Sequence, residues 1–297
     1  MFDINMIILE GPDLSGKTTL YSQIHAESNY KWNIQDRSTL SMICYARQFN
    51  RDTSKLRRAL TRELTNLNNR MLVLLPSWKT LEERYYSRGD EIQTLSSLRS
   101  LYEIFLDEAS KIKGLPNVSM LSETSDETAK SVVRMLSRIE NKNTMEVGSD
   151  ISEFIVNYHT NEERLDMSFT GQILGSHDDE ILSDPLEGDY YKEILWDFEN
   201  VIRKELRGIN PYHVVQGMDS RRFYYSSDSC MSSIHFMPRG ETLKCHVVFR
   251  STNAVKNAGI DLTFVNYLVH KLGNKYFSLC ENYELDVRMN SAHLIAR

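Results

Sequence analysis

The chain has 297 residues, of which 41% are hydrophobic and 26% charged, with a formal net charge of −6 at pH 7. This length can supply two domains with separate cores, and the acidic balance argues against a nucleic-acid binder with a broad basic surface. Apolar runs such as residues 6–9 and 71–75 are far too short to cross a bilayer, no secretory signal pattern opens the sequence, and the four cysteines form no CxxC pair. We therefore expect a cytoplasmic protein (host cytoplasm if the chain is viral) without membrane contact, disulfide framework or zinc site.

The first motif is GPDLSGKT at residues 11–18, which matches GxxxxGK[ST] at every fixed position. An apolar stretch at residues 4–9 predicts a strand before it, and residues 17–26 predict a helix after it. In such a loop, backbone N–H groups surround phosphate oxygens, and the helix N-terminus adds its positive dipole end. Lys17 would reach the β- and γ-phosphates, and the Thr18 hydroxyl would hold Mg²⁺. The alternative is a chance match within a strand, turn and helix.

The motif thus predicts an ATP site formed by the whole loop and the start of the helix. Its expected residues are Gly11, Pro12, Asp13, Leu14, Ser15, Gly16, Lys17, Thr18 and Thr19.

Three later stretches accompany the loop. Asp36-Arg37-Ser38 is the first, RMLVLLPSW at residues 70–78 predicts a buried parallel strand, and LEERYYSRGDEIQ at residues 81–93 is rich in charge. Together with the acidic Asp13, these stretches resemble the thymidylate kinase family. The resemblance implies that Asp13 contacts the deoxyribose of the acceptor nucleotide, and that Asp36 and Arg37 follow a central strand, with Arg37 at the acceptor phosphate.

The resemblance also implies that residues 81–93 form a lid over ATP, with Arg84, Arg88 and Asp90 as its polar groups. Arginines on such a segment neutralise charge during phosphoryl transfer. The alternative for Arg84 and Arg88 is a solvated helix face. One departure from the family is that only eighteen positions separate Thr18 from Asp36, which leaves the choice of acceptor base open.

The remainder of the first half continues the alternation of strands and helices. Apolar residues at helical spacing over 92–112, a strand at 117–122 and a helix at 126–139 complete it. We predict a three-layer α/β P-loop kinase domain with a parallel sheet over residues 1–142. Ligands would bind at the carboxyl ends of its strands.

From residue 141 the pattern changes. The polar stretch 141–150 predicts a linker, followed by a second domain over residues 150–297. Helices are predicted at 189–206 and 262–272, and short strands at 221–227, 232–238 and 243–250, the last two joined by a hairpin. Strands grouped apart from helices indicate an α+β domain.

An ordered set of residues in this half resembles the thymidylate synthase and deoxycytidylate hydroxymethylase superfamily, over about residues 170–297. The set is Glu193 in YYKEILW, Asp219-Ser220-Arg221-Arg222, Cys230 in DSCM, Arg250-Ser251 with the segment after it, and His293 in NSAHLI.

The resemblance implies a role for each member. Cys230 would be the nucleophile and Glu193 would manage protons and water, while His293 would contact the ribose. Arg250 and Ser251 would hold the 5′-phosphate together with Arg221 and Arg222 of a neighbouring subunit, which implies a homodimer through this domain. Asp261, where synthases have Asn, would favour dCMP over dUMP.

The residue types of this set suit one-carbon transfer to C5 of a pyrimidine. A thiolate that adds to pyrimidine C6 activates C5 for attack on a one-carbon unit, supplied in this superfamily by 5,10-methylenetetrahydrofolate. The alternative for these residues is a purely structural role. A cysteine is commonly a small buried hydrophobe, as expected for Cys245 and Cys280, and His293 can be an interior histidine. Asn253 and Ile295 replace family residues, and the family's closing segment is absent, so nucleotide binding without carbon transfer is also open.

The leading hypothesis is a bifunctional, or formerly bifunctional, deoxynucleotide enzyme. One domain would phosphorylate dTMP or a modified pyrimidine deoxynucleoside monophosphate with ATP and Mg²⁺, and the other would bind a pyrimidine deoxynucleotide for C5 one-carbon transfer. One alternative makes the second domain an inactive dimerisation or nucleotide-sensing module. Another makes the kinase act on modified bases in DNA, which the negative net charge disfavours.

Overall fold

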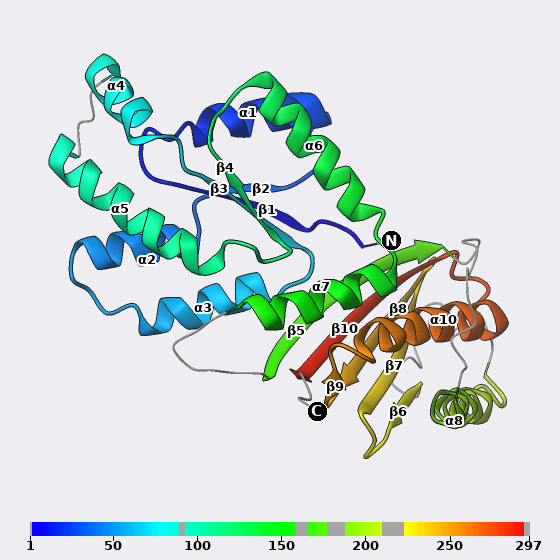
Figure 1. Ribbon diagram of the computed structural model, residues 1–297. Helices are drawn as coiled ribbons and strands as arrows, with labels where there is room; N and C mark the ends of the chain where they lie inside the picture. The colour runs from blue at the N-terminus through cyan, green and yellow to red at the C-terminus, as the bar shows by residue number, and fades with distance from the viewer. Residues whose placement is uncertain (1, 89–92, 159–165, 177–187, 210–222, 294–297) are drawn as a thin grey trace. The chain divides into compact units, whose positions relative to one another are not determined.

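The chain folds into two compact units, seen in the computed structural model in Figure 1. The structure describes residues 2–88, 93–158, 166–176, 188–209 and 223–293. The first unit contains residues 4–141 together with 156–158. The second contains residues 2–3 and 142–155 and the described residues from 166 onward.

The first unit is built on a four-stranded parallel sheet with the order β2-β1-β3-β4. The strands are β1 (Met6–Glu10), β2 (Ile34–Asp36), β3 (Asn69–Leu74) and β4 (Val118–Leu121). The helices are α1 (Lys17–Ser28), α2 (Thr39–Gln48), α3 (Ser54–Leu64), α4 (Trp78–Arg88), α5 (Leu95–Ile112) and α6 (Asp126–Glu140).

Both faces of this sheet are covered by helices. On one face, α1 and α6 pack on apolar side chains of β1 and β3, among them Ile7, Leu9 and Leu72. Helices α2, α3 and α5 lie on the other side in Figure 1, where Cys44 of α2 packs with Phe105 of α5. Because both faces are buried, β1 and β3 contain the continuous apolar runs 6–9 and 71–74. The predicted α/β architecture with a parallel sheet is confirmed.

One expectation about this sheet is wrong. The motif analysis places Asp36 after a central strand, whereas β2 is an edge strand of the described sheet. The short spacing explains the difference, because α1 and β2 use up nearly all of the chain between Thr18 and Asp36 and leave no residues for a further strand outside β2.

The second unit is built on a six-stranded mixed sheet with the order β5-β10-β8-β7-β6, in which β9 also pairs with β10. Its strands are β5 (Asp166–Ser176), β6 (Tyr224–Ser226), β7 (Met231–Arg239), β8 (Thr242–Phe249), β9 (Thr252–Asn253) and β10 (Asn282–His293). Its helices are α7 (Thr144–Asn157), α8 (Asp189–Glu205) and α10 (Ala258–Tyr276).

Strands β7 and β8 form an antiparallel hairpin that turns at Gly240, which confirms the predicted hairpin. Side chains along β8 and β10 alternate between buried and partly exposed positions, so one face of the sheet is apolar. The other face carries a row of polar cross-strand neighbours: Gln172, Asp286, His246, His235 and Tyr224. A sheet with one packed and one polar face is typical of antiparallel architectures.

The stretch 141–150, predicted to be a linker, is mostly helix α7. The side chains of Asn143 and Glu146 each accept a hydrogen bond from the other residue's backbone N–H, at 2.9 and 2.8 Å, so they form a reciprocal cap at the helix start. Gly148 lets α7 approach α10, because a Cβ atom there would lie 2.2 Å from the backbone nitrogen of Gly259. The polar composition of this stretch reflects a helix cap.

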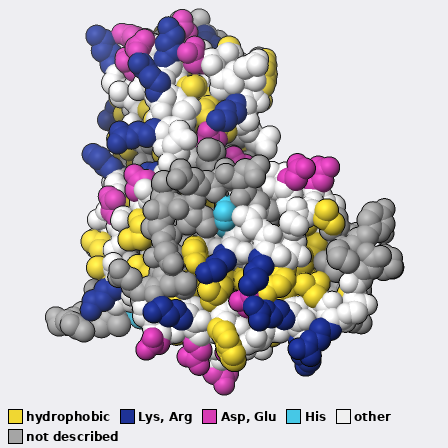
Figure 2. Space-filling model, turned by 90° about the vertical axis from the view of Figure 1, so that its right-hand side faces the viewer, with side chains coloured by type: hydrophobic (Ala, Val, Ile, Leu, Met, Phe, Trp, Pro, Cys, Tyr) yellow, Lys and Arg dark blue, Asp and Glu magenta, His cyan; other side chains and the backbone are white. Residues whose placement is uncertain are grey.

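Within the described part of the chain, each helix is too short or too polar to span a bilayer. Figure 2 shows basic and acidic side chains on the same face of the molecule, interspersed with hydrophobic and neutral ones.

Candidate nucleotide-binding site

The glycines of the loop at residues 11–18 are required by its packing. Gly11 and Gly16 have φ values of 145° and 102°, which side-chain-bearing residues rarely adopt. A Cβ atom at Gly11 would lie 2.4 Å from the carbonyl oxygen of Leu74, and one at Gly16 would lie 2.9 Å from Oγ1 of Thr124. The loop therefore fits closely between the end of β3 and the segment that follows β4.

Lys17, the first residue of α1, points back into this loop. Its ammonium group donates to the carbonyl oxygens of Gly11 and Pro12 at 2.7 and 2.8 Å, and to Oγ of Ser15 at 3.3 Å. Burial, and then the charge of Arg37, lowers the pKa of Lys17 to about 8. Thr18 and Thr19 follow in the first helical turn, and both are exposed.

Arg84 of α4 reaches the same loop from the predicted lid. Its Nη1 donates to the carbonyl oxygens of Leu14 and Ser15, at 2.8 and 2.7 Å. The structure therefore brings Arg84 and Lys17, both predicted phosphate ligands, to one loop. Arg88 ends α4 with an exposed side chain, whereas Asp90 lies outside the described residues.

Asp13 is the centre of a second cluster. It forms an ion pair with Arg37, and its Oδ2 accepts hydrogen bonds from the hydroxyl of Tyr45, at 2.7 Å, and from the amide of Gln93. Burial alone would raise the pKa of Asp13, but the hydrogen bond from Tyr45 and the charges of Arg37 and Lys17 outweigh it and lower the pKa. Asp13 is thus ionised and held in place.

The cluster contains two residues that the sequence analysis did not select. The Tyr45 ring lies under the Arg37 guanidinium, 5.6 Å from its carbon to the ring centroid, and Gln93 comes from the end of the predicted lid. Tyr45 lies eight positions after Arg37, in the helix that follows it, and this proximity is the only feature of the sequence that indicates a contact. Asp36 is exposed at the end of β2, and its charge acts to raise the pKa of Lys17.

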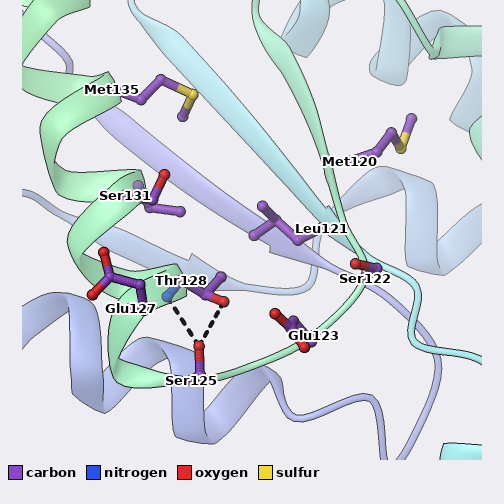
Figure 3. A pocket seen from close by; sticks show the side chains of 10 residues that line it. Met120, Leu121, Ser122, Glu123, Ser125, Glu127, Thr128, Ser131 and Met135 are labelled. Carbon is purple, nitrogen blue, oxygen red and sulfur yellow. Dashed lines mark hydrogen bonds between the residues drawn. The ribbon is translucent and has the colours of Figure 1, made fainter.

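A groove of about 340 Å³ lies between β4 and α6, as Figure 3 shows. It combines apolar side chains with hydroxyl and carboxylate groups: Met120, Leu121, Ser122, Glu123, Ser125, Glu127, Thr128, Ser131, Val132 and Met135. Ser125 caps α6 by accepting from the backbone N–H of Thr128, at 3.1 Å. Thr124, between the lining residues Glu123 and Ser125, packs against Gly16, so the groove begins beside the loop at residues 11–18.

In the second unit, the structure brings three of the predicted residues together. Cys230 is exposed just before β7, and its carbonyl accepts a hydrogen bond from the backbone N–H of Arg250, at 2.7 Å. The Ser251 hydroxyl lies 3.8 Å from the Cys230 sulfur. Glu193 is exposed on α8, and His293 ends β10, where its carbonyl accepts from the N–H of Ala254.

Asp261 is buried in the first turn of α10. Its carboxylate oxygens accept hydrogen bonds from the Tyr191 hydroxyl, at 2.8 Å, and from the Thr252 hydroxyl. Burial raises the pKa of Asp261 to about 6, although the two hydrogen bonds oppose the rise. Its oxygens are thus occupied by side chains of this unit. Arg221 and Arg222, with Asp219 and Ser220, lie outside the described residues.

Comparisons with known proteins give a limited result. No family model matches the chain, and no curated protein matches it. Among solved structures, the Bacillus subtilis YorR protein, described as a complex with phosphorylated GDP, is similar with a TM-score of 0.39 and 19% sequence identity. The match covers 45% of this chain and 96% of that one.

Proposed function

We propose that the first unit is a nucleotide kinase that transfers a phosphoryl group from ATP to a deoxynucleoside monophosphate. The observation that carries this proposal is the convergence of Lys17, Arg84 and the Arg37–Asp13 pair on one glycine-containing loop at the carboxyl end of β1. Phosphoryl transfer depends mainly on positioning and on neutralising phosphate charge, and this arrangement can supply both.

On the donor side, the backbone amides of the loop would hold the ATP phosphates. Lys17 and Arg84 now donate to carbonyl oxygens of the loop, and phosphate oxygens would replace those acceptors. Mg²⁺ supplies further charge neutralisation when bound, and the exposed Thr18 hydroxyl would hold it. The groove beside Thr124 has the mixed lining that a nucleobase requires, so we assign it to the base of the donor.

On the acceptor side, the Arg37 guanidinium would bind the monophosphate, and Asp13 would accept a hydrogen bond from the sugar. Tyr45 and Gln93 orient the Asp13 carboxylate for that purpose. The resemblance to the thymidylate kinase family makes dTMP, or a modified pyrimidine monophosphate, the expected acceptor.

For the second unit we propose binding of a pyrimidine deoxynucleotide, with Cys230 as nucleophile for C5 one-carbon transfer from 5,10-methylenetetrahydrofolate, and assembly as a homodimer. The grouping of Cys230 with Arg250 and Ser251 supports this proposal. The burial and internal hydrogen bonds of Asp261 favour the second candidate, an inactive dimerisation or sensing module, because its carboxylate is already engaged by side chains of this unit.

The kinase proposal is tested by incubating the purified chain with ATP, Mg²⁺ and each deoxynucleoside monophosphate. We expect one of them to yield a diphosphate, and Lys17→Ala and Arg84→Ala to lose most of that activity. Lys79→Ala is the matched control, since Lys79 is an exposed residue of the same helix α4 as Arg84. Absence of product from every monophosphate would refute the proposal.

Tritium release from C5 of dCMP or dUMP, with 5,10-methylenetetrahydrofolate present, tests the second unit. Carbon transfer predicts release that Cys230→Ala abolishes. A sensing module predicts that the nucleotide binds without tritium release and that folate does not bind. Calorimetry measures the binding of nucleotide and of folate.

A further inference from the structure

Arg37 has an unusual backbone conformation. Its φ of 65° lies in the left-handed region, which a residue with a long side chain adopts only when its surroundings impose it. The backbone N–H of Arg37 donates to the carbonyl of Leu9 in β1, at 2.9 Å, and the next residue, Ser38, begins the cap of α2. The backbone of Arg37 is therefore held directly by β1.

Glu10, the last residue of β1, holds Ser38, the residue that follows Arg37. Its side chain is fully buried and accepts hydrogen bonds from the backbone N–H of Ser38, at 2.8 Å, from the backbone N–H of Ser41, at 3.2 Å, and from the Ser41 hydroxyl. Burial raises the pKa of Glu10, and the hydrogen bonds from Ser41 and Ser38 oppose that rise.

Ser38 and Ser41 are the N-cap and third residues of α2. The backbone N–H groups at these two positions are the ones that a capping box satisfies with side chains of the helix itself. Here the Ser38 side chain does not cap the helix, and its hydroxyl donates instead to Glu63 of α3, at 2.6 Å. Glu10 thus caps α2 from another element, and its charge also suits the positive end of the helix dipole.

We propose that Glu10 is a positioning residue for phosphoryl transfer, which fixes Arg37 relative to the phosphate loop. It caps α2 and holds the left-handed turn that sends the Arg37 side chain back to Asp13. Because Glu10 ends β1 and directly precedes Gly11, the donor loop and the acceptor arginine are both held from the end of one strand. This inference rests on the proposed kinase function.

The chemistry requires a carboxylate at this position. The donors of Ser38 and Ser41 include backbone N–H groups, which cannot become acceptors, so both side-chain oxygens of Glu10 are needed. In Glu10→Gln an NH₂ group would replace one oxygen and face a backbone N–H. Glu63 is the matched control, because its carboxylate accepts from the hydroxyls of Ser38 and Thr39, which can reverse and accept from an amide.

The experiment compares the full chain with Glu10→Gln and Glu63→Gln. For Glu10→Gln we expect KM for the monophosphate acceptor to rise about tenfold or more. Loss of the α2 cap would misplace Arg37, which is the proposed ligand of the acceptor phosphate. ATP affinity and the affinity for the corresponding nucleoside, which has no phosphate for Arg37, should change less than about twofold. Glu63→Gln should match the wild type in all three measurements.

Equal losses of ATP, monophosphate and nucleoside affinity in Glu10→Gln would overturn the proposal, since they would indicate a general structural role, and so would an unchanged monophosphate affinity. If the wild type phosphorylates no monophosphate, the kinase proposal fails and positioning is tested by crystallography. Loss of the left-handed φ of Arg37 and of its ion pair with Asp13 in Glu10→Gln would then support the role of Glu10. Retention of both would refute it.

Discussion

Replacement of Asp261 by Asn is expected to stabilise the second unit near neutral pH. Both partners of this buried carboxylate, Tyr191 and Thr252, are neutral hydroxyls, each able to donate or accept a hydrogen bond. An amide in place of the carboxylate can accept from one hydroxyl and donate to the other. The variant therefore gives up a buried charge without leaving either partner unsatisfied.

The magnitude follows from the pKa of Asp261, which rises from 3.8 to about 6 on folding. Since the folded state holds the proton more tightly, the free energy of unfolding falls as the pH rises through this interval. At about 1.36 kcal/mol per pH unit, the loss reaches about 3 kcal/mol above pH 7. The advantage of Asp261→Asn should accordingly be at most about 3 kcal/mol at pH 7.5 and only about 1 kcal/mol at pH 4.5.

Differential scanning calorimetry of both proteins at the two pH values measures this effect. For a unit of this size, about 3 kcal/mol corresponds to a rise in Tm of about 6 to 12 °C at pH 7.5. A Tm difference that does not change with pH, or a variant less stable than the wild type at pH 7.5, would refute the assignment of the cost to the buried charge.

Three further predictions concern packing, charge and reactivity. Glu108→Gln should lower the free energy of unfolding in urea by about 1 to 3 kcal/mol, because the buried carboxylate pairs with Arg47, Arg57 and Lys111, which are themselves partly exposed. Gly148→Ala should cost about 3 kcal/mol or more, since its Cβ would meet the backbone of α10, whereas Gly208→Ala, with open space and a φ of 78°, should cost only about 1 kcal/mol. A thiol reagent should label Cys230 alone in the folded protein, as the other cysteines are buried, and Cys230→Ser should remove that labelling, which mass spectrometry detects.

The conformation of the loop at residues 11–18 could be predicted because its requirements are local. Both glycines have left-handed φ values, and Lys17 follows at the spacing that returns its ammonium group to the loop. The positions of Tyr45 and Gln93 depend instead on how α2 and the segment before α5 pack against the loop. No short motif records such long-range contacts.

Elsewhere the sequence contains local signals that the functional motifs do not cover. Asn143 and Glu146 have the spacing of a capping box, and buried residues follow at helical spacing in α7. Strand β10 alternates buried and more exposed residues over most of its length, a strand signal that begins well before the motif around His293. The grouping of Cys230 with Arg250 could be expected, because the hairpin of β7 and β8 joins the two.

Phe2 belongs to the second unit, although the residues that follow it in the sequence form the first unit. It is 3% exposed and bridges to Ile173 of β5, so a residue at the very start of the sequence completes a core that is otherwise made from residue 142 onward. A protease nick between Asn141 and Lys142 would therefore leave the larger C-terminal fragment in need of an aromatic ring carried by the N-terminal fragment. The nicked halves should co-elute as a complex, and should part more readily once Phe2 is replaced by Ala.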